Sequence, residues 1–185
     1  MKNLNYFLDL EIPNGVQVSV NRSLITVNGP KGEISRDLNN PRIVFSVENN
    51  KFFIRSRKDV KFSSSDKMFM NTYLAHIKNM VKGVQKSFNA KLKVCSGHFP
   101  MQVTVAGDSL QIKNFLGEKV PRKTNIIDGV KVTIQGDTII LEGIDKEKVG
   151  QTAAKIEQAT RITNRDRRIF QDGIYIIQKP DEGDQ

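Results

Sequence analysis

Alternating apolar and polar residues dominate the first part of the chain and predict short β-strands. Residues 16–20 alternate between valine and polar side chains, and the apolar run 24–27 ends in the glycine-rich sequence 28–32. The apolar stretches 43–47 and 52–54 flank an Asn-Asn pair, and asparagine tolerates the positive φ that a hairpin turn requires. This pattern predicts a meander of about four short strands.

Around Asp66 the apolar period changes from two residues to three or four, which predicts a helix. Its apolar face would hold Met70, Leu74, Ile77, Val81 and Val84. On another face Lys78, Lys82 and Lys86 form a stripe, which with Lys31 is a candidate secondary contact for RNA or protein. A solvated helix surface is the alternative explanation of the stripe.

The same order of elements recurs about 87 residues later. Residues 43–54 align without a gap on residues 130–141, and at the same offset Val16 and Val18 align on Val103 and Val105. Two copies of one unit are therefore encoded.

The second copy predicts strands at 101–105, 110–112, 130–134 and 139–141. A helix follows, with Asp145 as its N-cap and one face formed by Val149, Ala153, Ile156 and Thr160. Strands are also expected at 90–95, which could belong to either copy, and at 173–177.

The predicted fold class is α+β, with two tandem homologous modules that each have a small antiparallel sheet and one helix packed across a face. We expect modules at 1–88 and 89–179, and we expect the acidic residues 180–185 to form a disordered tail.

Composition adds a strong positive charge. The 185 residues contain 29 Lys and Arg against 20 Asp and Glu, a formal net charge of +9, so a polyanion or an anionic membrane face is the natural partner. No apolar stretch approaches the roughly 20 residues of a membrane helix, which argues against insertion. One cysteine and two histidines provide neither an internal disulfide nor a closed zinc site, so a cytosolic, metal-free protein is expected.

Catalytic motifs are weak. Cys95 and His98 lie close in sequence, but a nucleophilic dyad needs an orienting third group, so we expect Cys95 to serve packing and no residue to be catalytic. The glycine-rich sequence 28–32 lacks the spacing of a phosphate-binding loop, and a turn explains it. A small cysteine hydrolase remains the alternative from the enzyme class.

The cations cluster in two loops of the second copy that the first copy lacks. Loops tolerate variation and often carry function, and arginine matches phosphate geometry bidentately. The alternative is that these side chains are solvated or complement a helix dipole. The candidate RNA-binding residues are Lys119, Arg122, Lys123, Arg161, Arg165, Arg167 and Arg168.

Several blocks of sequence resemble the universal large-subunit ribosomal protein six family in its archaeal and eukaryotic form, which eukaryotic naming calls nine. The blocks are Asn28-Gly-Pro-Lys-Gly32, His76 to Val84, Lys91 to Val94 with His98 to Met101, Asn114 to Lys119, Gln151 to Thr160 and Asp166 to Tyr175. The weakest match is residues 57–66, so no contact is carried over to that segment.

The resemblance implies two modules from an ancient duplication and a non-catalytic role without cofactor or metal. It implies a structural constituent of the large subunit that binds large-subunit ribosomal RNA, mainly through the second module, near the sarcin-ricin loop where translational GTPases dock. Neighbouring large-subunit proteins are further expected partners, and a membrane is not. A free RNA-binding adaptor outside the ribosome is the other alternative.

Overall fold

The computed structural model describes residues 6–57 and 61–182, which belong to two units, Met1–Lys86 and Ser87–Gln185. The sequence left open which unit contains the strand at 90–95. This strand, β7 (Phe88–Cys95), pairs with β12 (Thr138–Gly143) and β13 (Gly173–Glu182), so it belongs to the second unit. The division therefore falls two residues before the predicted boundary, because Phe88 already pairs with Gly143.

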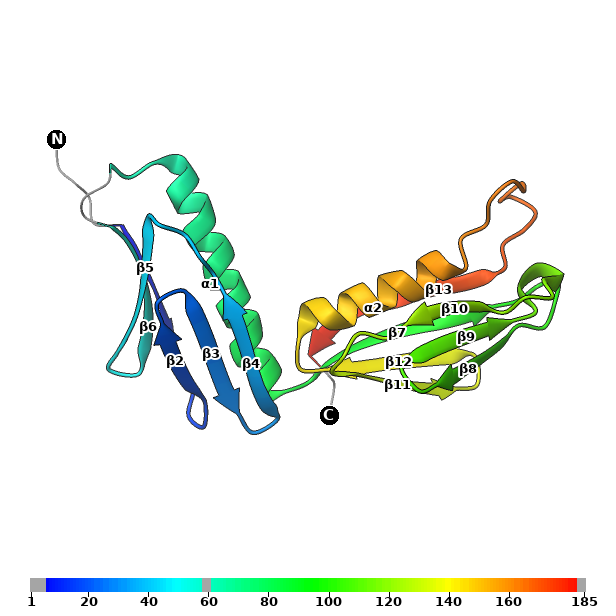
Figure 1. Cartoon of the computed structure of the whole chain (residues 1–185), viewed down its shortest axis with the longest axis horizontal. Coiled ribbons are helices and arrows are strands. Elements are labelled where there is room, and N and C mark those ends of the chain that lie inside the picture. Colours follow the sequence, from blue (N-terminus) through cyan, green and yellow to red (C-terminus); the bar gives the residue numbers. More distant parts are fainter. Residues whose placement is uncertain (1–5, 58–60, 183–185) are drawn as a thin grey trace. The chain divides into compact units, whose positions relative to one another are not determined.

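The described residues of the first unit form two three-stranded antiparallel sheets and one helix (Figure 1). One sheet has the order β1-β6-β5, and the other has its strands in chain order, β2-β3-β4. The elements are β1 (Phe7–Glu11), β2 (Gln17–Asn21), β3 (Leu24–Gly29), β4 (Gly32–Asp37), β5 (Ile43–Glu48), β6 (Lys51–Ser56) and α1 (Ser64–Gln85).

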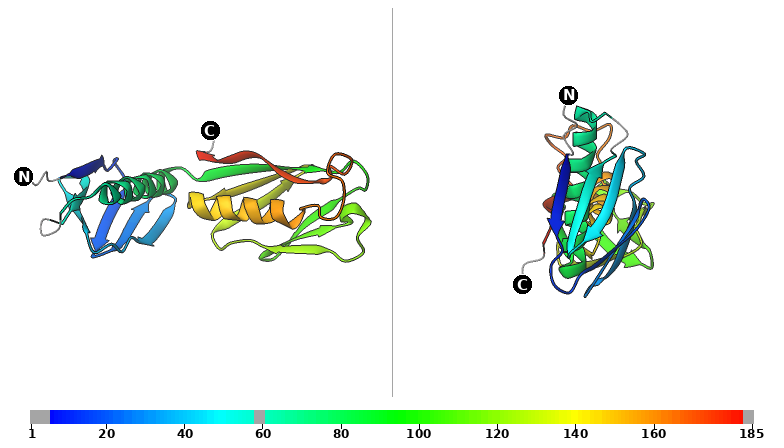
Figure 2. Two further views of the ribbon diagram at one scale, coloured as in Figure 1. Left: turned by 90° about the horizontal axis from the view of Figure 1, so that it is seen from above. Right: turned by 90° about the vertical axis from the view of Figure 1, so that its left-hand side faces the viewer.

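The second unit repeats this plan with one strand added. Its sheets have the orders β10-β9-β8 and β11-β12-β7-β13, and each helix lies along the strands of its own unit (Figures 1 and 2). The remaining elements are β8 (Gln102–Ala106), β9 (Ser109–Lys113), the 3-10 turn η1 (Phe115–Gly117), β10 (Arg122–Asn125), β11 (Val130–Gln135) and α2 (Lys146–Ala159).

The topology confirms the α+β fold class and the duplication. The order β5-β6-β1 in the first unit matches β11-β12-β7 in the second, and β2-β3-β4 matches β8-β9-β10. Each module nevertheless has two sheets where one was expected, because β1 pairs with β6 and not with β2, which divides the meander. Among the strands of the described residues, only β13 has no counterpart in the first unit.

The expected disordered tail at 180–185 is wrong for its first three residues. Pro180 to Glu182 belong to β13, where Asp181 pairs with Asn89 and Glu182 pairs with Phe88. Backbone hydrogen bonds to β7 therefore order a segment whose composition alone predicts disorder. Residues 183–185 lie outside the described residues.

Each unit buries its own core between helix and strands. In the first, Met70, Ile77 and Val84 of α1 pack with apolar strand residues such as Phe52, and in the second Val149, Ala153 and Ile156 of α2 do the same. Each fully buried aliphatic side chain contributes about 1.5–3 kcal/mol. In the part of the chain that is described, neither helix is long and apolar enough to cross a membrane.

The start of α1 is fixed by a capping box and by an ion pair between the partly exposed Arg42 and the buried Asp66. The Ser63 hydroxyl accepts the Asp66 N–H at 3.3 Å, and Asp66 Oδ2 accepts the Ser63 N–H at 2.8 Å. Arg42, just before β5, donates to both carboxylate oxygens of Asp66 at 2.7 and 2.8 Å. These bonds, first that from Arg42, lower the pKa of Asp66 to about 2.

The glycine-rich turn between β3 and β4 closes over the end of α1. A Cβ on Gly29 would lie 2.7 Å from Val84 Cγ2 and 3.0 Å from the Val84 carbonyl oxygen. The same carbonyl accepts the Lys31 N–H at 2.9 Å, which satisfies one of the last carbonyls of the helix. Gly29 is therefore needed for close approach of strand and helix.

Because the pKa of Asp66 lies below the ordinary value of 3.8, the stabilisation from its charged form should be complete above about pH 4 and decline as the pH falls toward 2. We expect the free energy of unfolding of Asp66→Asn to depend less on pH over this window than that of the unaltered protein. Urea unfolding followed by circular dichroism at pH 5, 4, 3 and 2 measures this. Glu48→Gln, which removes the exposed pair with Arg55, is the control and should change the pH dependence less.

Gly29→Ala should destabilise the protein by about 1–3 kcal/mol, because the new methyl group would overlap Val84. The matched control is Gly150→Ala within α2, where Pro180 Cγ at 3.5 Å is the one atom among the described residues that the new Cβ would meet. There alanine should stabilise the helix by about 0.5–1 kcal/mol. Urea unfolding of both variants distinguishes the two signs, and equal stabilities would contradict the close-approach explanation.

Candidate nucleic-acid interface

Three loops of the second unit meet at one end of its sheets, and these are the loops after β7, around η1 and after α2 (Figure 1). Residues of the first loop contact Asp172, at the end of the third. Arg122, which follows the η1 loop, contacts the backbone where α2 ends. The two cationic clusters predicted from the sequence, 117–123 and 161–168, therefore come together at this end.

Asp172 fixes the C-terminal end of the arginine-rich loop. Its buried carboxylate accepts the backbone N–H of Gly97 at 2.5 Å and of His98 at 3.3 Å, and the His98 Nδ1 lies 3.2 Å from Oδ2. The His98 ring also lies 5.1 Å from the ring of Phe170. The last residues of the loop are thus held against the loop after β7.

Arg122 fixes the other end of the same loop. Its Nη1 donates to the carbonyl oxygens of Ala159 at 2.8 Å and Arg161 at 3.3 Å, so it satisfies groups left open at the end of α2. Its Nε and Nη2 bind the Glu118 carboxylate at 2.8 and 2.6 Å, and its Cζ lies 4.1 Å from the centre of the Phe115 ring. The Arg122 bond lowers the pKa of Glu118, helped by the charges of Arg122 and Arg165. The fold thus already uses the guanidinium of this predicted RNA-binding residue.

Two other predicted arginines have partners within the loop. Arg168 forms an exposed ion pair with Asp166, Nη2 to Oδ2 at 2.8 Å, which lowers the pKa of that carboxyl. Arg165 lies over the ring of Phe170 at 5.1 Å, which leaves its N–H groups able to donate. An exposed pair of this kind is worth little, so Arg168 could exchange Asp166 for a phosphate.

Four predicted cations are exposed and have no ion-pair or hydrogen-bond partner for their side chains in the described part of the chain. They are Lys119, Lys123, Arg161 and Arg167. Arg161 lies at the start and Arg167 in the middle of the loop whose two ends are fixed by Arg122 and Asp172. Their charge is therefore available to an external anion at a defined place.

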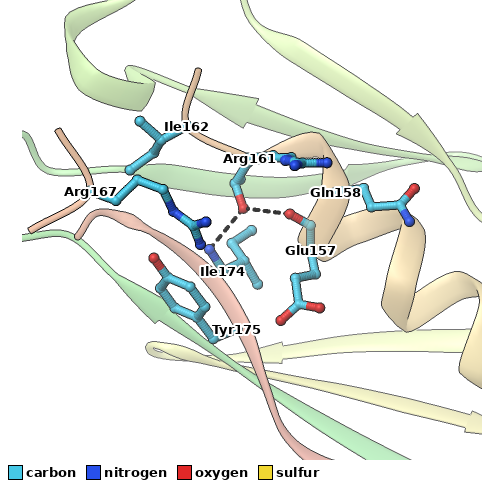
Figure 3. A pocket seen from close by; sticks show the side chains of 8 residues that line it. Glu157, Gln158, Arg161, Ile162, Arg167, Ile174 and Tyr175 are labelled. Atoms are coloured by element: carbon cyan, nitrogen blue, oxygen red, sulfur yellow. Dashed lines mark hydrogen bonds between the residues drawn. The ribbon is translucent and has the colours of Figure 1, made fainter. Parts of the chain in front are cut away.

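Arg161 and Arg167 also line a cavity of about 400 Å³ between the end of α2 and β13, shown in Figure 3. At the back of the cavity the Thr160 hydroxyl accepts the Ile174 N–H at 2.9 Å and donates to the Glu157 carbonyl at 3.1 Å. Tyr175 of β13 also lines the cavity (Figure 3). The cavity thus combines two unpaired cations with an exposed aromatic ring.

The predicted secondary cations lie in the first unit. Lys78 and Lys82 are exposed on α1, Lys86 is the half-buried C-cap residue, and Lys31 is in the turn that covers the end of this helix. Lys82 has an interaction within the protein and is not free. Three of the four, Lys31, Lys82 and Lys86, thus gather where the negative end of the helix dipole favours cations.

The Cys95 and His98 pair does not form a nucleophilic site in the described structure. Asp172 supplies the orienting carboxylate that the sequence did not reveal, but Cys95 is a half-buried free thiol that makes no hydrogen bond to His98 within the described chain. Among the described residues no group of three His, Cys, Asp or Glu is placed to hold a metal ion.

Sequence reasoning missed Asp172 and Tyr175. Asp172 and His98 are 74 residues apart, and no local pattern connects them. Tyr175 had a signal, since strand alternation places it on the opposite face from the apolar Ile174 and Ile176. The pairing of Arg122 had one too, because Glu118 precedes it by four residues.

Comparison with known proteins relates the whole chain to one family. The model of the family described as Ribosomal protein L6 matches residues 12–87 and 99–173, which are two successive matches that correspond to the two units.

Individual relatives agree with this match over nearly the full length. A protein named large ribosomal subunit protein uL6 from Methanocella arvoryzae is 46% identical over 172 residues, which cover 92% of this chain and 96% of that protein. Proteins of the same name from Ignicoccus hospitalis and Methanococcus vannielii are 47% and 45% identical, and cover 90% and 92% of this chain and 91% and 92% of their own length. The chain therefore belongs to the ribosomal protein L6 family, whose members are structural proteins and not enzymes.

Proposed function

We propose that this chain is a structural constituent of the large ribosomal subunit and binds large-subunit ribosomal RNA with the loop end of its second unit. The observation that carries the proposal is the pair Arg161 and Arg167, two exposed and unpaired arginines on a loop whose ends, among the described residues, are both anchored. Such anchoring lowers the ordering cost of binding, since the loop need not be fixed by the RNA.

Family membership supports the ribosomal part of this proposal. The relatives described above are named as proteins of the large ribosomal subunit and match this chain over at least nine-tenths of its length. We accordingly assign it to the ribosome, with ribosomal RNA and neighbouring ribosomal proteins as its partners.

The cations of the loop end suit the backbone of folded RNA. Folded RNA is recognised through its shape, its phosphates and its 2′-hydroxyl groups more than through a sequence code. Arg161 and Arg167 would bind phosphates bidentately, and Lys119 and Lys123 would add point charges. Arg165 and Arg168 join them from the same loop, whereas Arg122 contributes by holding the loop in place.

We extend the proposal to the location that the family resemblance implies. The RNA bound by this end would lie near the sarcin-ricin loop, with translational GTPases as neighbours. A free RNA-binding adaptor is the competing function. It predicts that the native protein stays at the top of a sucrose gradient at moderate salt, whereas our proposal predicts that it sediments with large subunits.

Replacing both Arg161 and Arg167 by alanine should weaken binding to large-subunit ribosomal RNA and flatten its dependence on salt. For each phosphate that the variant no longer neutralises, the slope of log K against log salt concentration should decrease by about one. Filter binding at several salt concentrations measures both quantities. Arg22→Ala with Arg36→Ala in the first unit is a charge-matched control, and an equal effect of the two pairs of substitutions would refute the assignment of the site.

Asp172→Ala should weaken RNA binding although it removes a negative charge. Without the carboxylate, the N–H groups of Gly97 and His98 lose their acceptor and the loop loses its anchor, at a cost of about 1–3 kcal/mol in stability. Asp166→Ala also removes one carboxylate from the loop, but it frees Arg168 and should leave binding unchanged or make it tighter. If the two variants bind RNA equally tightly in the same filter assay, net charge and not loop position governs binding.

A further inference from the structure

We infer that the cavity between the end of α2 and β13 takes a single unstacked nucleotide of the bound RNA, with the base against the ring of Tyr175 and the adjoining phosphates on Arg161 and Arg167. This inference rests on the proposed function and assigns a ligand to one part of that surface. Arg161, Arg167 and Tyr175 all line this cavity (Figure 3).

The cavity has the size and wall chemistry of a small-molecule site. Its volume of about 400 Å³ lies within the range of about 300–1,000 Å³ that ligand pockets span. Ile162 provides an apolar part of the wall, while Gln158 and Glu157 provide polar groups from α2. A nucleotide needs this mixture, because its base has apolar faces and a polar edge.

The ring of Tyr175 is held in place and is available for stacking. Its hydroxyl donates to the Gln171 carbonyl at 3.1 Å, and its side chain is exposed and contacts no other aromatic ring within the described residues. A Cβ on Gly173 would lie 3.2 Å from the phenol end of this ring, so glycine at that position leaves room for it. The ring therefore has a fixed position before any ligand binds.

The charges place the phosphate and the base in different parts of the cavity. The guanidinium groups of Arg161 and Arg167 have no hydrogen-bond or ion-pair partner among the described residues, so they attract the phosphates. Glu157 repels phosphate, and its Oε1 already accepts the Ile176 N–H at 3.2 Å. A carboxylate can accept further N–H groups, so the Glu157 side suits the edge of a base and the arginine side suits the backbone.

The physical chemistry of RNA favours this occupant. Bases in single-stranded loops and bulges can leave the stack and pack on aromatic side chains. Such stacking tolerates any base, because every base has a π-face. A cationic loop alone would attract the phosphates of RNA. An aromatic ring together with two arginines can also bind a base.

The test compares two ligands of equal backbone charge bound to the full chain. Hexa-adenylate is titrated into the protein, and in parallel a hexamer with the same ribose-phosphate backbone and no bases. We expect the ring proton resonances of Tyr175 to move in nuclear magnetic resonance spectra with hexa-adenylate only. Tyr175→Leu should weaken hexa-adenylate binding about tenfold and leave binding of the abasic hexamer unchanged.

Tyr175→Phe is the matched control, because it keeps the aromatic face, and it should bind hexa-adenylate nearly as tightly as the unaltered protein. Unfolding curves of both variants show whether each remains folded. The inference is overturned if Tyr175→Leu weakens both ligands equally or neither. The proposed function is tested separately by the binding of ribosomal RNA. If that binding depends on Arg161 and Arg167, the proposed function stands even without the nucleotide pocket. If that binding does not depend on them, the proposed function is refuted whatever the result for Tyr175.

Discussion

The end of α2 imposes the constraint on which the arrangement of the second unit depends. A helix that ends beside three loops presents unsatisfied carbonyl groups and the negative end of its dipole. A positively charged hydrogen-bond donor stabilises both. Arg122 provides that donor, and the same guanidinium binds Glu118 and covers the ring of Phe115. One side chain thereby ties the η1 loop to the start of the arginine-rich loop. Asp172 fixes the other end of that loop. The middle of the loop can therefore expose its arginines to solvent while both ends stay bound to the rest of the unit.

Duplication supplied the scaffold, and the function we propose depends on what the second copy has beyond the first. β13 and the loop before it have no counterpart in the described part of the first unit. Net charge alone would instead favour the first copy as the one that binds RNA. Residues 1–87 contain 14 Lys and Arg against 7 Asp and Glu, whereas residues 88–185 contain 15 against 13. What matters for an external anion is the number of cations without internal partners at one place. Within the described residues Arg161 and Arg167 meet this condition, whereas Arg122 does not.

Much of the fold follows from the sequence, and less of the site does. The repeat and the change of apolar period near Asp66 predicted the two helices and most strands, since both patterns are local. The division of each meander into two sheets was not predictable, because it depends on the distant pairing of β1 with β6. Charge clustering located the cationic loops but treated all seven side chains alike. Telling Arg122 from Arg161 required knowing where the end of α2 lies, and that depends on packing across the whole unit.

The close approach of Tyr175 to Gly173 has an evolutionary consequence. A methyl group at position 173 would lie 3.2 Å from the phenol end of the ring, so the ring would have to shift to admit it, and the two positions are coupled. A relative with a larger residue at the first position would have to hold its aromatic ring elsewhere or do without it. Substitution at one of the two positions is therefore expected to alter the placement of the side chain at the other.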